Sequence, residues 1–396
     1  MQTPQQHQYS SVTAVLPRTS LAGVYEALHQ QDQHFNLVWD GRGTLLSEQW
    51  WRRWVPPISP AKSIVHMIAP SHRVELIERT IIEQARLDKQ STGAVFSNPC
   101  SHTLFGGGLS AWVGEQATNE DRTVSNILTE ELSAIYCIVG HNLSDRVSHA
   151  AIRAGAHGPI VFYSEGRGLR DRLGWLRITK EHEKEVLLVI AEEDQADGIF
   201  NAMADAGQLH LPGRGFMYRV PISKGMFNLP SRMTHQQHEA SMQQIIHAID
   251  HLTGHQHWRD QAVFKIQGKG RAAGLNQLPK TVEQHNQACL SVIVHREEAD
   301  RLLETLLDSG APGLNFNYAR LTGDTVIAGS TAHISDEYAL LRCITGDESA
   351  RHMCALLGDL QSDQLSRFCA YLNPAPRVAT YVPGKVDHRV QKTVSL

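Results

Sequence analysis

The sequence lacks three features that assign many proteins at once: a long apolar run, paired cysteines and a catalytic motif. No stretch of the 396 residues approaches the ~20 consecutive apolar residues that cross a membrane as a helix. The N-terminus, MQTPQQHQYSS, has no charged-then-apolar order, so it does not resemble a signal peptide. We therefore expect a cytoplasmic protein without a membrane-inserted segment.

Cysteine usage and charge exclude further classes. The six cysteines have no CxxC spacing, and Cys137, Cys289 and Cys343 fall in strand-like runs, where cysteine is usually a small buried apolar residue. Lys and Arg total 37 against 41 Asp and Glu, a net charge of −4. This balance disfavours a general nucleic-acid-binding role, because such proteins carry an excess of basic residues.

No motif identifies a catalytic residue. A nucleophile elbow, an HExxH pair, a Walker sequence and a carboxylate pair with a placeable geometry are all absent from the sequence. We therefore predict no catalytic residue and expect a protein that is not an enzyme.

What the sequence does contain is a repeat. One order of elements (strand, helix, strand ending in glycine, polar loop, strand, helix, strand) occurs three times at a period of roughly a hundred residues. In the first copy, Leu21, Val24, Tyr25 and Leu28 recur at helical spacing after an apolar strand at 12–16. The expected domains are residues 10–100, 131–225 with a helical extension at 226–285, and 286–385.

Each copy predicts a βαββαβ unit, in which two helices cover one face of a four-stranded antiparallel sheet. The other sheet face must also be covered, and neighbouring copies are the expected cover. The third copy diverges most, with its second strand ending in Thr322-Gly323 and its fourth strand expected at 378–382. We predict an α+β fold of three tandem ferredoxin-like domains, in which one chain does what three subunits do in a trimer.

Copies one and two resemble the PII signal-transduction family. The resemblance rests on WDGRG at 39–43, the run 63–96 beginning SIVHMIA, SEGRG at 164–168, and the run 185–225 beginning EVLLVIA. It implies three PII-like domains in an intramolecular pseudo-trimer with non-equivalent clefts. It also implies an adenine nucleotide (ATP, ADP or AMP) as effector in those clefts, and a T-loop that regulates a membrane transporter or an enzyme.

The candidate ligand-binding residues come from two kinds of glycine-rich turn. Glycine lets a phosphate approach the backbone, and arginine donates charge-assisted hydrogen bonds to it. The two Gly-Arg-Gly segments match the entry to the family's T-loop, and the turns before the fourth strands match its phosphate-contacting B-loop. In copy one Ala94 stands where the family has a lysine, so Lys89 would substitute. The candidates are Gly41, Arg42, Gly43, Lys89, Gly93, Gly166, Arg167, Gly168, Gly213, Arg214, Gly215 and Arg377.

The polar loop of copy one contains a candidate partner-binding cluster, Trp50, Trp51, Arg52, Arg53 and Trp54. Tryptophan and arginine are enriched at the energetic centres of protein interfaces. The alternative is that the tryptophans fold back onto the domains.

Two other functions stay open. A ligand-free structural or interaction module is favoured by the third copy, which lacks the glycine of the B-loop. A metal-responsive protein similar to the CutA family is suggested by 22 histidines, including His247 and His251 at i, i+4 in an expected helix. Scattered surface histidine is the better interpretation of these residues, so we predict no metal site.

Overall fold

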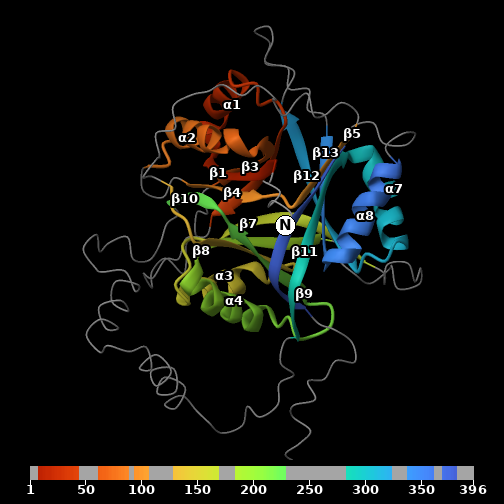
Figure 1. Cartoon of the computed structure of the whole chain (residues 1–396). Coiled ribbons are helices and arrows are strands. Elements are labelled where there is room, and N and C mark those ends of the chain that lie inside the picture. The colour runs from red at the N-terminus through yellow and green to blue at the C-terminus, as the bar shows by residue number, and fades with distance from the viewer. Residues whose placement is uncertain are drawn as a thin grey trace, which may run out of the picture. The chain divides into compact units, whose positions relative to one another are not determined.

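The computed structural model describes residues 8–43, 61–88, 93–106, 128–168, 183–228, 282–322, 337–360 and 368–380. These residues form three segments, each with the predicted order of strands and helices (Figure 1). The first segment contains β1 (Tyr9–Pro17), α1 (Leu21–His29), β2 (Asn36–Gly43), β3 (Ala61–Pro70), α2 (Val74–Ala85), β4 (Gly93–Pro99) and β5 (His102–Gly106).

The second segment contains β6 (Leu132–Gly140), α3 (Ser144–Arg153), β7 (Ile160–Gly168), β8 (Glu183–Glu192), α4 (Glu193–Gly207), β9 (Gly215–Ile222) and β10 (Lys224–Asn228). The third segment contains β11 (Val282–His295), α7 (Arg296–Asp308), β12 (Gly313–Thr322), β13 (Glu337–Gly346), α8 (Asp347–Leu360) and β14 (Phe368–Thr380).

The prediction of three tandem ferredoxin-like domains in a pseudo-trimer is wrong. The strands form one continuous 14-stranded sheet in the order β10-β4-β1-β3-β2-β12-β13-β11-β14-β9-β6-β8-β7, with β5 beside β14. Because β7 also pairs with β2, nine of these strands close into an antiparallel barrel. The physical reason is that edge strands carry unpaired backbone groups, and here the edges of neighbouring segments satisfy one another.

Two kinds of contact join the segments. The second strands pair mutually, β2 with β7, β7 with β12 and β12 with β2. The extensions that follow the fourth strands cross to a neighbour: β10 pairs with β4, β5 with β14, and the second half of β14 with β9. Sequence periodicity describes each segment alone, so neither kind of contact was predicted.

Four hydrophobic clusters hold the sheet and its helices together. Three of them each join one helix pair (α1 with α2, α3 with α4, α7 with α8) mainly to the strands of its own segment, with a contribution from the strand extension of a neighbour: Met226, Ala379 and Leu104, respectively. The fourth lies on the opposite sheet face and takes residues from all three segments, among them Trp39, Tyr136, Phe162, Leu340 and Tyr371. The sheet faces are thus covered on both sides, as expected, although by a barrel interior shared between segments.

The third segment begins and ends its sheet differently from the prediction. Its fourth strand, β14, starts at Phe368 rather than at Val378, and its first strand, β11, starts at Val282 rather than at Leu290. Arg377 therefore lies within a strand and not in a turn before one.

Residues Met1–Ser231 and Thr281–Pro383 form one compact unit, and a second unit, Arg232–Lys280 with Gly384–Leu396, lies outside the described residues. The expected helix with His247 and His251 belongs to that second unit. The predicted domain boundaries stay a prediction. All six cysteines are buried and unbridged. Within the described part of the chain, no helix has both the length and the apolar character needed to cross a membrane.

Candidate functional site

Arg42, the arginine of the first Gly-Arg-Gly segment, lies near the end of β2 and reaches into the second segment. Its Nη2 donates to Ser144 Oγ (3.0 Å) and to Asp145 Oδ1 (3.1 Å). Both acceptors belong to the first turn of α3, so one guanidinium joins two segments. The Arg42 side chain is 33% exposed and that of Asp145 is 71% exposed, so solvent reaches this pair.

The first turn of α3 gathers further polar groups. The Ser144 N–H donates to Glu185 Oε2 (3.1 Å), and Glu185 is buried on β8. The N–H groups of a first helical turn lack intrahelical partners and carry partial positive charge. A guanidinium, a hydroxyl and a helix N-terminus therefore converge here, and carboxylates of the chain itself satisfy them.

Arg167, the arginine of the second Gly-Arg-Gly segment, makes a related contact with the third segment. Its Nη1 donates to Asp300 Oδ1 of α7 (2.8 Å), and its Nη2 lies 3.6 Å from Glu165 Oε2. The guanidinium carbon also lies 5.8 Å from the ring centre of Phe316 on β12. Arg167 is thus a second junction arginine, held by an acid of the following segment.

The two Gly-Arg-Gly segments are nevertheless not equivalent. The second strands of the three segments pair with one another in the same register. In each pair, a residue of one strand lies opposite the residue that is four places before its own equivalent in the next strand. The pairs are Arg42 with Val161, Glu165 with Phe316, and Arg320 with Val38. Arg42 therefore corresponds to Glu165, and Arg167 lies two residues further along β7. The two Gly-Arg-Gly segments are therefore offset by two residues and do not both occupy the place of the T-loop entry.

Several predicted glycines are required by packing. A Cβ on Gly41 would lie 2.5 Å from Ile64 Cδ1 and 3.3 Å from the Val161 carbonyl oxygen, so this glycine permits β2 and β7 to meet. Gly93 and Gly215 start the fourth strands, and a Cβ on either would collide with a carbonyl oxygen of the adjacent first strand. Packing against the first strand therefore explains why a glycine starts the fourth strand in both segments, and no ligand is needed to explain it.

The remaining candidates fall at other places. Gly213 (φ 77°) and exposed Arg214 belong to the turn before β9, while Gly43, Gly166 and Gly168 lie in β2 and β7. Lys89 and the cluster at Trp50, Trp51, Arg52, Arg53 and Trp54 lie outside the described residues.

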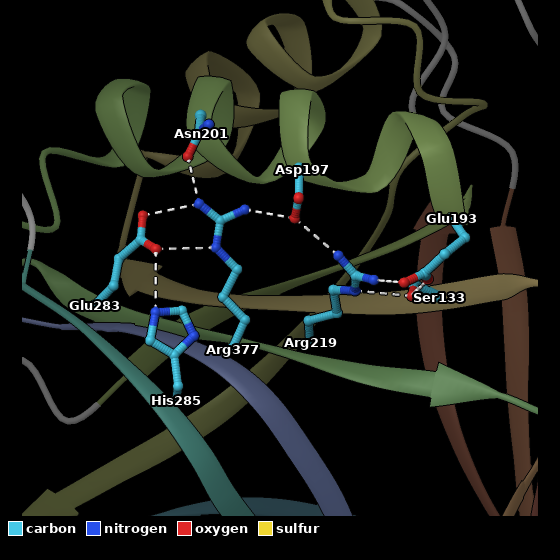
Figure 2. Close-up of polar contacts among 8 residues, drawn as sticks. All are labelled: Ser133, Glu193, Asp197, Asn201, Arg219, Glu283, His285 and Arg377. Atoms are coloured by element: carbon cyan, nitrogen blue, oxygen red, sulfur yellow. Dashed lines mark hydrogen bonds and ion pairs between the residues drawn. The ribbon is translucent and has the colours of Figure 1, made fainter.

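Arg377 takes part in a network between the second and third segments (Figure 2). Its guanidinium donates to Glu283 (3.1 and 2.8 Å), to Asp197 Oδ1 (2.6 Å) and to Asn201 Oδ1 (2.8 Å), and its Cζ lies 4.4 Å from the ring centre of Phe200. The pairing of β14 with β9 brings this predicted residue close to the strand that follows the Pro-Gly-Arg-Gly turn.

Sequence reasoning missed the second arginine of this network. Arg219 lies directly opposite Arg377 on β9, and it donates to Ser133 Oγ (2.9 Å), Asp197 Oδ1 (2.8 Å) and Glu193. Burial, and then the charge of Arg377, lower the pKa of Arg219. A signal was available, since Arg219 interrupts an otherwise apolar strand, FMYRVPI. Asp197 bridges the two cations.

The described residues contain no cluster of metal-binding side chains. Across the described ranges, no group of three or more His, Cys, Asp or Glu side chains is arranged to hold a metal ion. The histidines that suggested a metal-responsive protein, from His235 to His257, lie outside those ranges.

Comparison with known proteins gives limited likenesses. No family model and no curated protein matches the sequence. Among solved structures, the chain is similar to Arabidopsis thaliana PII bound to citrate, at 21% identity over 24% of this chain and 79% of that chain, with a TM-score of 0.19. It is also similar to an aspartate kinase from Synechocystis, at 8% identity over 93% of this chain and 45% of that chain, with a TM-score of 0.19.

A mutant chlorite dismutase from Candidatus Nitrospira defluvii matches at 12% identity, over 63% of this chain and 93% of that chain, with a TM-score of 0.15. At such TM-scores none of these likenesses carries an argument about function. The contacts of the chain itself must carry it.

Proposed function

We propose that this chain is a regulatory protein that binds a small anionic effector where its first two segments meet, at Arg42 and the first turn of α3. An adenine nucleotide is the first effector to test, because the resemblance of the sequence to the PII family implies one. The target would be a second protein, of the transporter or enzyme class.

One observation carries the proposal: the Arg42 guanidinium and the Ser144 hydroxyl meet at a helix N-terminus, opposite the solvent-exposed carboxylate of Asp145. This donor set suits a phosphate or carboxylate. Asp145 is 71% exposed, so its side chain can swing into solvent at little cost. An effector anion would take its place on Arg42.

Such an exchange would also couple the effector to the rest of the chain. Arg42 immediately precedes Gly43, where β2 ends, and its contact with Asp145 ties that strand end to the next segment. An anion that binds Arg42 in place of Asp145 would free the end of β2 from the second segment. It would thereby shift the population of the strand end between two states, which is the requirement for regulation.

The test is isothermal calorimetry of the wild-type chain against ATP, ADP, AMP, cyclic AMP and bicarbonate, with two variants. Arg42→Gln should weaken binding about tenfold or more, because a charge-assisted hydrogen bond contributes about 1.5–3 kcal/mol. Asp145→Asn should tighten binding about three- to tenfold, because it removes the carboxylate that competes for Arg42.

The opposite signs of the two variants separate a binding site from a structural ion pair. If the contact only holds the segments together, both variants lower the melting temperature and neither alters affinity. Arg18→Gln is a matched control, since Arg18 is an exposed arginine of the first segment whose contact with Asp40 is long (4.0 Å). The proposal fails if no compound in the panel binds below millimolar concentration.

A second function is favoured by a specific observation. Arg42, Arg167, Arg219 and Arg377 are all already paired with acids of the chain. A ligand-free interaction module would show this arrangement. Partner capture that is unchanged in the Arg42→Gln and Arg167→Gln variants would favour that function over effector binding.

A further inference from the structure

A layer of polar side chains crosses the interior of the barrel. On the third segment, Asn315, Arg342, Ser291 and Tyr371 form one row across four adjacent strands, because Arg342 pairs with both Asn315 and Ser291, and Ser291 pairs with Tyr371. The neighbours of Arg342 on its own strand at alternate positions, Leu340 and Ile344, belong to the shared inner cluster. By strand alternation Arg342 shares their face.

The other two segments complete this layer. The Arg342 guanidinium carbon lies 5.2 Å from the ring centre of Tyr136, whose ring stacks on Tyr218 at 5.1 Å. From the first segment, His66 Nε2 lies 2.5 Å from the Tyr371 hydroxyl, and its Nδ1 lies 2.9 Å from Thr13 Oγ1. Arg342, 5% exposed, is therefore enclosed by groups from three segments.

No described carboxylate pairs with the positive charge of Arg342. None of the ion pairs among the described residues includes Arg342, and its neighbours are amides, hydroxyls, rings and the Cys289 thiol, whose pKa burial raises. Burial, and then the charge of Arg342, lower the pKa of His66 well below its usual range, so this imidazole is neutral. Burial raises the pKa of Tyr218 and Tyr371, so these hydroxyls also stay neutral.

An isolated charge in an apolar interior is costly, and arginine does not escape the cost by losing its proton. The same interior face holds polar atoms without a hydrogen-bond partner among the described residues: Asn315 Oδ1, Asn317 Oδ1, Ser164 Oγ and Trp39 Nε1. Asn315 is next to Arg342 across the sheet, and all four side chains are more than nine-tenths buried. Buried polar groups are normally satisfied by protein partners or ordered water, and two of these four atoms, Ser164 Oγ and Trp39 Nε1, can donate a hydrogen bond to an anion.

We propose that a small monovalent anion binds Arg342 inside the barrel. A single guanidinium calls for a single negative charge, and the surrounding hydroxyls donate hydrogen bonds as well as accept them. The class comprises halides and oxyanions the size of bicarbonate. The site shares no residue with the junction at Arg42, so it stands independently of the proposed effector site.

Thermal unfolding at increasing sodium bromide concentration tests the site, and the same series measured on a variant without the Arg342 charge corrects for the general effect of salt on stability. The wild-type melting temperature should rise in a saturable way, by about 3–5 °C once bromide exceeds its dissociation constant a hundredfold. Arg342→Gln should abolish the rise, while Arg351→Gln, an exposed arginine on α8, should keep it. A rise that persists in Arg342→Gln overturns the proposal.

Crystals of the wild-type chain soaked in bromide give a second measurement that does not depend on whether Arg342→Gln folds. The expected result is an anomalous peak beside the Arg342 guanidinium. Water alone at that position, or a carboxylate of the chain, overturns the proposal. Because Arg42→Gln should keep the bromide response, failure of the effector site and failure of the interior site are distinguishable.

Discussion

At the residue scale, the positions that say most about function and stability are polar side chains buried in the hydrophobic core. His66, Leu188 and Arg342 take the same position in the third strand of each segment, as their pairings with Thr13, Tyr136 and Ser291 show. One of the three is the hydrophobic residue that a core favours, and the other two are polar. Glu78 is a further case, a fully buried carboxyl on α2.

Glu78 should make stability depend on pH. Burial raises its pKa from 4.5 to about 7, and the Ser97 hydroxyl and the Lys224 charge offset only part of this rise. The folded state therefore holds a proton that the unfolded state releases, so stability falls as pH rises from about 4.5 through 7. The full loss is about 3 kcal/mol, at 1.36 kcal/mol for each unit of pKa.

Glu78→Gln, which is neutral at every pH, should remove this loss. Urea unfolding at pH 5 and at pH 8 measures it: the wild type should lose about 3 kcal/mol more than the variant between the two values. Glu83→Gln, on the exposed face of the same helix, is the matched control and should follow the wild type. Equal pH dependence in all three proteins would show that Glu78 does not titrate as described.

At the element scale, β9 and β14 place two arginines opposite each other, and α4 supplies the acid between them (Figure 2). Like charges directly opposite in a sheet are destabilising. Asp197 Oδ1 accepts from both guanidinium groups, at 2.8 Å from Arg219 and 2.6 Å from Arg377. Asp197 is the carboxylate that both arginines share, while Glu193 pairs with Arg219 alone and Glu283 with Arg377 alone, so Asp197 lowers the repulsion between the two opposed arginines.

Asp197→Asn should lower the free energy of unfolding by about 1–2 kcal/mol, less than for a fully buried ion pair because Asp197 is 67% exposed. Added salt screens the repulsion between the arginines, so the deficit should shrink in 0.5 M NaCl, roughly a threefold rise over physiological ionic strength. Asp205→Asn removes one charge from the same helix and should cost much less, because no ion pair joins Asp205 to an arginine among the described residues. A deficit independent of salt, or equal in both variants, would contradict this role.

The helices and most strands of each segment could be predicted, because their apolar periodicity is local. The stripe at Leu302, Leu303, Leu306 and Leu307 is buried as expected. The candidate site could be predicted only in part. Arg42 and Arg167 do lie at segment junctions, but their partners are set by contacts more than a hundred residues away in sequence. Register across such distances leaves no periodic signal, so the sequence alone does not reveal that the two Gly-Arg-Gly segments are offset by two residues.

At the scale of the whole molecule, the fold depends on contacts between segments rather than on three self-sufficient cores. The shared inner cluster takes side chains from every segment, and the second strands close the barrel through their mutual pairings. Removing any one segment would expose an apolar sheet face and unpaired strand edges. The sequence repeat does not reveal that each segment depends on its neighbours, because a repeat of this length is also typical of independent domains.

Differential scanning calorimetry of the full chain tests this interdependence most directly. The segments should unfold together, in a single transition whose calorimetric and van't Hoff enthalpies agree. Two or three separable transitions, each with an enthalpy suited to about a hundred residues, would contradict it, because they would mean that the segments are stable without one another.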